Sequence, residues 1–237
     1  MDLGSLSTQL KDKELFKQQC FINGKWEDSD NGETFDVLNP SDLTVVGSMP
    51  NCSKSDTIKA IDAANSSWEA WKKLTGKDRS IIIRKWHELI LENIDDLALI
   101  MTLENGKPIA DARGEIIYAS WFTDWFSEEA KRTYGKTIPS TMADRRMMSI
   151  KQPIGVCGII TPWNFPAAMI TRKIAPALAA GCPVVIKPAG STPFSATALV
   201  ELAHRAGVPN GVINLISVSE ENVSEVGDEL CTNNHVR

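Results

Sequence analysis

The feature that most constrains the fold is a regular alternation of apolar runs and helical patterns over residues 156–230. The apolar runs are Val156–Ile160, Val184–Ile186 and Val212–Ile216, and the helical segments that follow them are Ala167–Ala180, Pro193–Ala206 and Glu221–Leu230. Apolar strands joined by helical crossovers form a parallel sheet that helices cover on both faces. The alternation therefore predicts an α/β fold, with functional residues just after 160, 186 and 216, at the carboxyl ends of the strands.

The residues before this alternation divide into a β-rich start and three helical patterns. Short β-like runs punctuated by Asn-Gly and Asn-Pro pairs fill residues 20–50, a composition typical of hairpins and turns. Ser53 and Asp56 have the spacing of a capping box, which predicts a helix start. The three helical patterns extend over residues 53–71, 78–106 and 108–135.

The last of these patterns carries a bulky aromatic face. It consists of Ile117, Trp121 and Trp125 with the neighbouring Phe122 and Phe126. Such a face could stack on a ligand, but aromatic residues at helical spacing usually belong to a core, and a core is what we expect. Residues 136–152 then show weak alternation and no covering helix, which predicts an exposed arm.

Composition and charge exclude several classes of protein. The net charge is −5 and no basic cluster is interleaved with aromatic residues, so nucleic acid is not expected as a partner. The segment Ile174–Ile186 is interrupted by Pro176 and Pro183, which argues against a membrane span. The five cysteines are widely spaced without a C-x-x-C pair, so neither a disulfide framework nor a metal site is expected. Residues 1–20 mix acidic and basic residues without the apolar region of a secretory signal, which favours a cytoplasmic protein.

The first predicted strand is followed by Thr-Pro-Trp-Asn-Phe-Pro at residues 161–166. Pro162 and Pro166 fix φ on both sides of Asn164, so the side-chain NH2 is presented at a lower cost in ordering entropy, as an oxyanion stabiliser requires. Alternatively, Asn164 caps the helix that follows. The residues alone leave both interpretations open.

The second predicted strand is followed by Lys187 and a run of small residues before the next helix. A cation at a strand end, beside a helix N-terminus, suits hydroxyl and phosphate groups. A lysine that extends from a sheet edge into solvent explains Lys187 equally well. The chain has no G-x-G-x-x-G motif. The nearest match, Gly155 and Gly158, lacks the spacing of the motif and precedes its strand.

Taken together, the TPWNFP and VIKPA motifs within residues 153–217 resemble the cofactor-binding core of the aldehyde dehydrogenase superfamily. The likeness extends upstream through FINGKW, AIDAAN, MTLENGKP and SEEAKRTYG, so it covers the chain from about residue 18. The sequence MITRK after TPWNFP, and the stretch from ADRR to KQPIG, are most similar to the succinate-semialdehyde dehydrogenases within that superfamily.

The resemblance implies a Rossmann-like parallel sheet flanked by helices, with an N-terminal β/helical segment. Residues 1–135 would be the N-terminal part of the cofactor-binding domain, residues 136–152 a protruding oligomerisation arm, and residues 153–237 the βαβαβα core. The catalytic domain would be absent, which leaves the fold incomplete relative to the family. The family also implies a homo-oligomer, a dimer or a tetramer, in which the arm pairs with a C-terminal strand that this chain lacks.

The resemblance also assigns roles to particular residues. Asn164 would stabilise the oxyanion formed on the aldehyde, and Arg172 would face the carboxylate of the substrate, with which a guanidinium pairs bidentately. Without the family pattern, Arg172 would be an ordinary solvated residue of an amphipathic helix. Lys187 would hydrogen-bond the adenosine ribose hydroxyls. The expected cofactor-binding residues are Ile160, Thr161, Pro162, Trp163, Lys187, Ala189, Gly190 and Ser191.

The expected cofactor is NADP or NAD. NAD-preferring members of the superfamily often carry Glu three residues after the lysine, where it holds the ribose 2′-hydroxyl and repels a 2′-phosphate. This chain has Gly190 at that position. Lys187 and Ser191 could donate to a 2′-phosphate, so NADP should be tolerated or preferred.

The implied function is NAD(P)-dependent oxidation of a small-molecule aldehyde, and the expected reaction converts succinate semialdehyde to succinate in GABA degradation. The family's nucleophilic cysteine and general-base glutamate find no match here, and burial in or beside apolar strands would raise the thiol pKa of Cys157 and Cys182. The chain alone is therefore expected to be inactive. Two alternatives stay open: a truncated, non-catalytic homologue that acts as a binding or regulatory module, and a dehydrogenase for another aldehyde.

Overall fold

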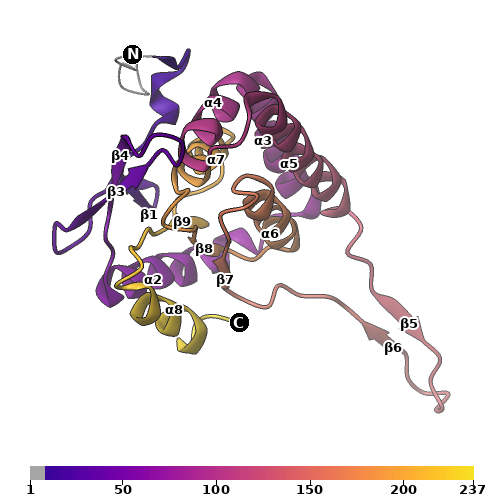
Figure 1. Cartoon of the computed structure of the whole chain (residues 1–237). Coiled ribbons are helices and arrows are strands. Elements are labelled where there is room, and N and C mark those ends of the chain that lie inside the picture. The colour runs from indigo at the N-terminus through magenta and orange to yellow at the C-terminus, as the bar shows by residue number, and fades with distance from the viewer. Residues whose placement is uncertain (1–8) are drawn as a thin grey trace.

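A five-stranded sheet forms the centre of the computed structural model, which describes residues 9–237 (Figure 1). Its strands, in spatial order, are β2 (Lys25–Glu27), β1 (Cys20–Ile22), β9 (Ile213–Leu215), β8 (Val184–Lys187) and β7 (Cys157–Ile160). The three strands predicted from the alternation are parallel, and Ile186 lies opposite Ile159 on one side and Leu215 on the other. The α/β sheet is thus confirmed. The hairpin of β1 and β2 extends it antiparallel to β9, which the alternation does not indicate.

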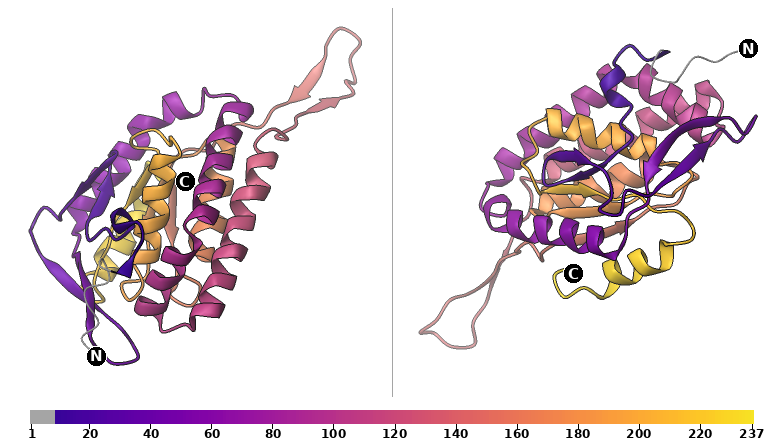
Figure 2. Two further views of the ribbon diagram at one scale, coloured as in Figure 1. Left: turned by 90° about the horizontal axis from the view of Figure 1, so that it is seen from above. Right: turned by 90° about the vertical axis from the view of Figure 1, so that its left-hand side faces the viewer.

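Helices cover the sheet on both faces (Figures 1 and 2). One face carries α2 (Lys54–Trp71) and α8 (Val223–Thr232); the other carries α6 (Ala168–Ala180) and α7 (Phe194–Arg205), with α3 (Gly76–Glu92), α4 (Ile94–Asn105) and α5 (Ile109–Glu129) packed against them. Successive residues of β8 point to opposite faces. Val184 and Ile186 join the larger apolar cluster with α3 to α7, and Val185 joins the smaller cluster with α2 and α8. Burial on both faces explains why this strand is apolar almost throughout.

Helix boundaries follow local signals where those signals are strong. The capping box predicted at Ser53 and Asp56 is present at the start of α2, and a second capping box starts α3 at Thr75. The pattern expected as one helix over residues 78–106 is two helices, because the backbone leaves the helical region at Asn93, with φ −109° and ψ 21°. Apolar periodicity continues across this break, so the single helix expected there is wrong.

Helix α5 differs from its expectation in two respects. It ends at Glu129 and not at Gly135. Ile117, Trp121 and Trp125 are 40%, 61% and 65% exposed, so the expectation that these three side chains belong to the core is wrong. Phe122 and Phe126 are partly buried against the core. The buried face of α5 carries small residues such as Ala119, which allow its neighbours α3, α4 and α6 to approach closely. Position on the helix, and not aromatic character, decides which residues are buried.

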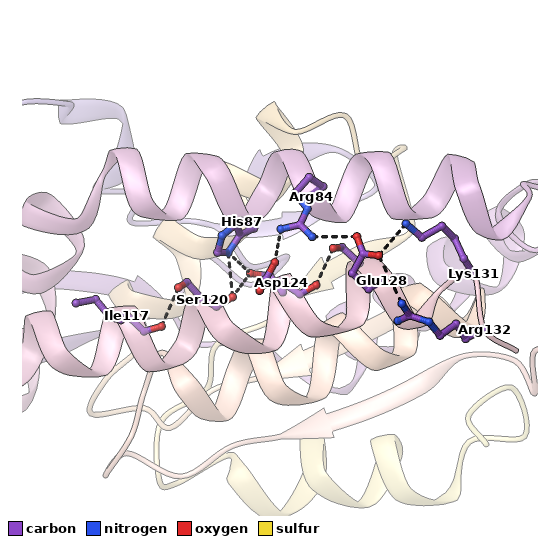
Figure 3. A network of polar contacts seen from close by, with 10 residues as sticks. Arg84, His87, Ile117, Ser120, Asp124, Glu128, Lys131 and Arg132 are labelled. Carbon is purple, nitrogen blue, oxygen red and sulfur yellow. Dashed lines mark hydrogen bonds and ion pairs between the residues drawn. The ribbon is translucent and has the colours of Figure 1, made fainter.

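A polar network joins α3 to α5 along their length (Figure 3). Arg84 pairs with Asp124 and with Glu128, the latter at 3.1 Å between Nη2 and Oε1. His87 Nδ1 lies 3.0 Å from the carbonyl oxygen of Ser120. The charged side chains are partly exposed, so each pair contributes about 0–1 kcal/mol to stability. The network therefore helps to set the register of the two helices, while the apolar core supplies most of the stability.

Residues 136–152 form a hairpin of β5 (Lys136–Ile138) and β6 (Met147–Ser149) that projects from the body of the molecule (Figures 1 and 2). The two strands are antiparallel, with Thr137 opposite Met148. Every residue of both strands is exposed, Met148 by 74%. The hairpin therefore presents apolar side chains to solvent.

The N-terminal part of the described chain contains a short helix and a second hairpin. These are η1 (Lys13–Leu15), β3 (Thr34–Leu38) and β4 (Val45–Pro50). Residues 1–8, the first part of the segment whose charges favour a cytoplasmic protein, lie outside the described residues. Within residues 9–237, no helix combines the length and the apolarity needed to cross a membrane.

Candidate active site and cofactor pocket

A pocket of about 470 Å³ opens beyond the carboxyl ends of β8 and β9. Its walls come from β3, from the segments that follow β8 and β9, and from the turn that follows β7. The lining residues are Phe35, Asp36, Val37, Leu38, Trp163, Lys187, Ala189, Gly190, Ser191, Val218, Ser219, Glu220 and Val223. Five of the eight expected cofactor residues are among them, and the three that are not are Ile160, Thr161 and Pro162.

Lys187 is the one lysine that lines this pocket, and it is 6% exposed. It ends β8, which lies between β7 and β9, so the interpretation of Lys187 as a solvated lysine at a sheet edge is wrong. Burial lowers the pKa of its ammonium group. Within residues 9–237, the acceptor of Lys187 Nζ is the carbonyl of Pro188 at 3.2 Å. An ammonium group has three donors, so Lys187 retains donors for a ligand.

The segment after β8 approaches the segment after β9 closely. A Cβ atom added to Gly190 would lie 2.8 Å from the carbonyl oxygen of Val218, so a larger residue there would require one of the two segments to shift. Ser191 is exposed at the pocket and free to meet a ligand. Two acidic residues, Asp36 and Glu220, line the same pocket. The pocket therefore offers both cationic and anionic groups to a ligand.

The turn that carries Asn164 connects β7 to α6. Thr161 is buried and its N–H donates to the carbonyl of Lys187 at 3.2 Å, which ties the start of the turn to β8. Residues 162–165 are exposed. The Asn164 side chain makes no hydrogen bond within residues 9–237, and the cap residue of α6 is Ala167. The interpretation of Asn164 as a helix cap is therefore wrong, and its amide is free to act as a donor.

Two buried glutamates cap the N-termini of α6 and α7, because the N-cap residues of these helices make no side-chain cap hydrogen bond. Glu115 of α5 accepts hydrogen bonds from the backbone N–H groups of Ala167 (3.0 Å) and Ala168 at the start of α6. Glu104 of α4 accepts hydrogen bonds from Phe194 (2.7 Å) and Ser195 at the start of α7. A carboxylate is stabilised at a helix N-terminus by the free N–H groups and the helix dipole. Sequence reasoning missed both glutamates, since each is a mid-helix residue with no local signal.

The pKa of Glu104 is shifted by its surroundings. It is 2% exposed, and burial raises the pKa of its carboxyl to about 7, although the N–H groups of Phe194 and Ser195 favour the ionised form. The negative charge of Glu115 acts in the same direction as burial. Glu104 therefore changes protonation near neutral pH.

Arg172 lies outside the pocket, on the exposed side of α6. Its guanidinium carbon is 5.4 Å from the ring centroid of Phe122 on α5, a cation–π distance. The Phe122 ring in turn meets Tyr118 edge-on, with 5.0 Å between centroids. Tyr118 lines a second hollow of about 410 Å³ beside Phe165. The aromatic chain thus leads from Arg172 towards the Asn164 turn.

Neither Cys157 nor Cys182 lies near these pockets. Both stand at the amino ends of their strands, opposite the edge that carries Lys187. The pKa of the Cys157 thiol is raised, first by its hydrogen bond to Cys182 and then by burial. Burial acts to raise the pKa of Cys182, as expected, but the hydrogen bond with Cys157 and those from the backbone N–H groups of residues 154 and 155 outweigh it and lower the pKa to about 6. Both thiols therefore lie at the end of the sheet opposite to the turn that carries Asn164.

Comparison with known proteins identifies relatives over nearly the whole chain. Residues 26–237 match the aldehyde dehydrogenase family. The chain is 57% identical over 229 residues to glutarate-semialdehyde dehydrogenase of Pseudomonas putida and also to succinate-semialdehyde dehydrogenase [NADP(+)] GabD of Escherichia coli, covering 97% of this chain and 47% of each relative. It is 48% identical over 218 residues to the human mitochondrial succinate-semialdehyde dehydrogenase, covering 92% of this chain and 40% of that protein. The chain therefore spans about half the length of these relatives.

Solved structures share the fold. The crystal structure of an E. coli NADP-dependent enzyme superposes with a TM-score of 0.94 at 57% identity, covering 96% of this chain and 47% of that one. Betaine aldehyde dehydrogenase of Staphylococcus aureus, in complex with NAD+, superposes with a TM-score of 0.92 at 33% identity, covering 98% of this chain and 45% of that one. The fold expected from the resemblance is thus confirmed over about half of the family's length.

Proposed function

Because the chain belongs to the aldehyde dehydrogenase family, we propose that it forms the cofactor-binding half of an enzyme that oxidises a semialdehyde to a carboxylic acid. The observation that carries the proposal is the pocket beyond β8, which is lined by a buried lysine with free donors and by Trp163 of the Asn164 turn. Succinate semialdehyde is the proposed substrate. Glutarate semialdehyde is the second candidate, since the relative named for it is equally similar.

The pocket residues fit a nicotinamide dinucleotide. Lys187 would hold the adenosine ribose hydroxyls with the donors that Pro188 leaves free, and Trp163 would line the cleft. When bound, this cofactor accepts the hydride that leaves the aldehyde carbon. The segment at Gly190 stays close to the backbone of Val218, which keeps this part of the pocket narrow.

Asn164 and Arg172 would act on the substrate. The free Asn164 amide would donate to the oxyanion that forms on the aldehyde carbon, and the exposed Arg172 guanidinium would pair with the distal carboxylate. None of the five cysteines lines either hollow, so we place the attacking thiolate outside this chain. The 237-residue chain alone should then show no dehydrogenase turnover.

Ser191 offers a test of cofactor choice. With Gly190 in place of an acidic residue, Lys187 and Ser191 would donate to a 2′-phosphate, although Asp36 and Glu220 in the same pocket oppose it. We expect the chain to bind NADPH more tightly than NADH. Ser191→Ala should weaken NADPH binding about 5- to 10-fold, through loss of a hydrogen bond to a charged group, and leave NADH binding unchanged.

Titration of NADPH and NADH, followed by nucleotide fluorescence, measures both affinities on the purified chain. Saturable binding that Ser191→Ala weakens for NADPH alone is the expected result. Absence of binding of either nucleotide would contradict the cofactor role. Equal loss for both nucleotides would contradict only the NADP preference.

The oligomeric and cellular settings follow from the same proposal. The projecting β5–β6 hairpin would mediate assembly into a dimer or tetramer, and the protein would be cytoplasmic. The alternative, a non-catalytic binding or regulatory module, is distinguished by the intact mass of the protein from its native source. A mass near 26.0 kDa favours the module, and a mass about twice as large favours the enzyme.

A further inference from the structure

The junction between α4 and α5 contacts the backbone of the Asn164 turn at two consecutive carbonyl groups. Asn105 Nδ2 donates to the carbonyl oxygen of Trp163 at 2.8 Å. Lys107 Nζ donates to the carbonyl oxygen of Asn164 at 3.2 Å. In the described part of the chain, no other side chain hydrogen-bonds to residues 162–165. This junction therefore provides the polar side-chain contacts that hold the turn.

The turn depends on such contacts because the sheet supports only its start. Thr161, where the turn begins, donates its N–H to the carbonyl of Lys187 on β8, but residues 162–165 are exposed. Pro162 and Pro166 fix their own φ angles, but the torsions of Trp163 and Asn164 remain free. The carbonyl of Phe165 accepts the N–H of Met169 in the first turn of α6, but Trp163 and Asn164 have no such backbone partner among the described residues. Ordering each residue costs about 1–2 kcal/mol, so these two residues would keep several conformations. The hydrogen bonds from Asn105 and Lys107 select one of them.

The two donors are themselves fixed by the shape of the junction. Gly106 ends α4 with φ +75°, in the left-handed region, and its N–H donates to the carbonyl of Thr102. A Cβ atom on Gly106 would lie 2.8 Å from Pro40, so glycine is required on steric grounds as well. Pro108 then starts α5. Gly106 thus turns the chain between Asn105 and Lys107 so that both side chains reach the same neighbouring backbone.

Lys107 connects both ends of the turn. Its ammonium group pairs with Glu115, whose side chain is 2% exposed, and lies 4.4 Å from the ring centroid of Phe165. The other oxygen of Glu115 accepts the N–H of Ala167 at the start of α6. The Asn164 carbonyl, the Phe165 ring and the helix start are therefore held through one cation.

We propose that Asn105 and Lys107 are positioning residues for Asn164: they hold the backbone of its turn in the one conformation from which the free Asn164 amide points at the reacting oxygen. The inference rests on the proposed function for the role of the amide. The positioning itself is a statement about the backbone and is measurable without turnover.

The first test measures backbone order in the 237-residue chain by ¹⁵N relaxation. In the unmodified chain, Asn164 should have an order parameter of about 0.85, typical of rigid backbone, and Lys107→Met should lower it to below about 0.6. Residues of β8 should be unaffected, and Lys107→Arg should restore order at Asn164. Because Lys107→Met leaves Glu115 without its cation and could unfold the chain, Asn105→Ala serves as the second variant and should loosen Trp163.

Lys173→Met is the matched control. Lys173 is also a lysine beside this turn, but its Nζ donates to the carbonyl of Ile160 at 2.8 Å, before the turn begins. Its removal should leave Asn164 ordered. Unchanged order at Trp163 and Asn164 in both Asn105→Ala and Lys107→Met would overturn the positioning role, as would equal loosening in Lys173→Met.

The second test measures turnover in a complete dehydrogenase, made by joining this chain to the downstream half of the E. coli relative. Lys107→Met should lower kcat about 10- to 100-fold, the cost of a misplaced catalytic group, and leave the KM for the cofactor unchanged. In an Asn164→Ala background it should cost nothing further, because a positioning residue acts through the residue it holds.

The outcomes of the second test separate the two proposals. If Asn164→Ala leaves kcat unchanged, the proposed oxyanion role fails, while the order parameters still decide whether Asn105 and Lys107 hold the turn. If Asn164→Ala lowers kcat but Lys107→Met lowers it equally with and without Asn164, the positioning role is overturned and the oxyanion role stands.

Discussion

The junctions that follow β7 and β8 are built alike but lie in opposite environments. In each, a parallel strand leads through a short segment to a helix whose first N–H groups donate to a buried glutamate of the outer helices, Glu115 in one case and Glu104 in the other. After β8, Lys187 is buried and lines a pocket. After β7, Asn164 is exposed. Within the described residues, β8 lies between two strands, whereas the side of β7 away from β8 carries only the parallel bridge from Val156 to Val236.

This difference shows how one local design serves two purposes. A central junction is enclosed by its neighbours, here β3 and the segment after β9, so it forms a binding pocket from this chain's own residues. The junction after β7 is held by Asn105 of α4 and by Lys107 in the connection to α5, and its residues 162–165 are exposed. The first arrangement suits holding a cofactor, and the second suits presenting a donor to a reacting group.

The largest expected effect is a difference in stability between alanine variants of the two capping glutamates, Glu115 and Glu104. Glu115→Ala would leave the Lys107 ammonium without its buried partner and free two N–H groups, so the free energy of unfolding should fall by about 3–5 kcal/mol. Glu104→Ala also frees two N–H groups but leaves no cation without a partner, so the free energy of unfolding should fall by only about 2 kcal/mol. Urea denaturation followed by circular dichroism measures both. Equal losses would show that the cation does not set the difference.

The second effect is a pH dependence at the central junction. Burial raises the pKa of Glu104 from the ordinary 4.5 to about 7, so the folded chain binds this proton more tightly than the unfolded chain. The resulting stabilisation is complete below pH 4.5 and is lost as the pH rises through 7, a change of about 3 kcal/mol. Glu104→Gln should remove this slope from urea denaturation measured between pH 4.5 and 8. Parallel curves for the two proteins would assign the slope to other groups.

The third effect is a substitution at Lys187 that should weaken nucleotide binding but raise stability. Lys187→Met should weaken NADPH binding about 10- to 100-fold, because it removes hydrogen bonds from a charged donor. The same change should raise the free energy of unfolding by about 1 kcal/mol, since the buried ammonium lacks a carboxylate partner within the described residues. Fluorescence titration and urea denaturation test the two parts. A variant that binds weakly and is also less stable would point to a structural role.

The smallest effect is expected at Arg172, on the exposed side of α6. Arg172→Gln removes a cation–π contact with Phe122 at an exposed site, so the free energy of unfolding should change by no more than about 0.5 kcal/mol. NADPH binding should be unchanged, because Arg172 does not line the cofactor pocket. Thermal denaturation and the nucleotide titration check this. A loss of several kcal/mol would mean that Arg172 supports the packing of α5 on α6.

Much of the fold was predictable because its signals are local. The apolar runs near residues 156, 184 and 212 correspond to β7, β8 and β9, and the capping box at Ser53 starts a helix as expected. Asn164 could be singled out because prolines flank it at a strand end. The break at Asn93 and the exposure of Trp121 could not be predicted, since periodicity describes a face of a helix but not what covers that face.

The sequence by itself determined the alternation of strands and helices, the parallel sheet and the positions after the strands at which residues line a pocket. Only the tertiary structure decided that Lys187 is buried, that Asn164 is not a cap, and that Glu104 and Glu115 cap helices 90 and 52 residues further along the chain. The physical reason is range. Hydrophobic periodicity and turn chemistry act over a few residues, whereas the partner of a buried charge is set by which helices the core brings together.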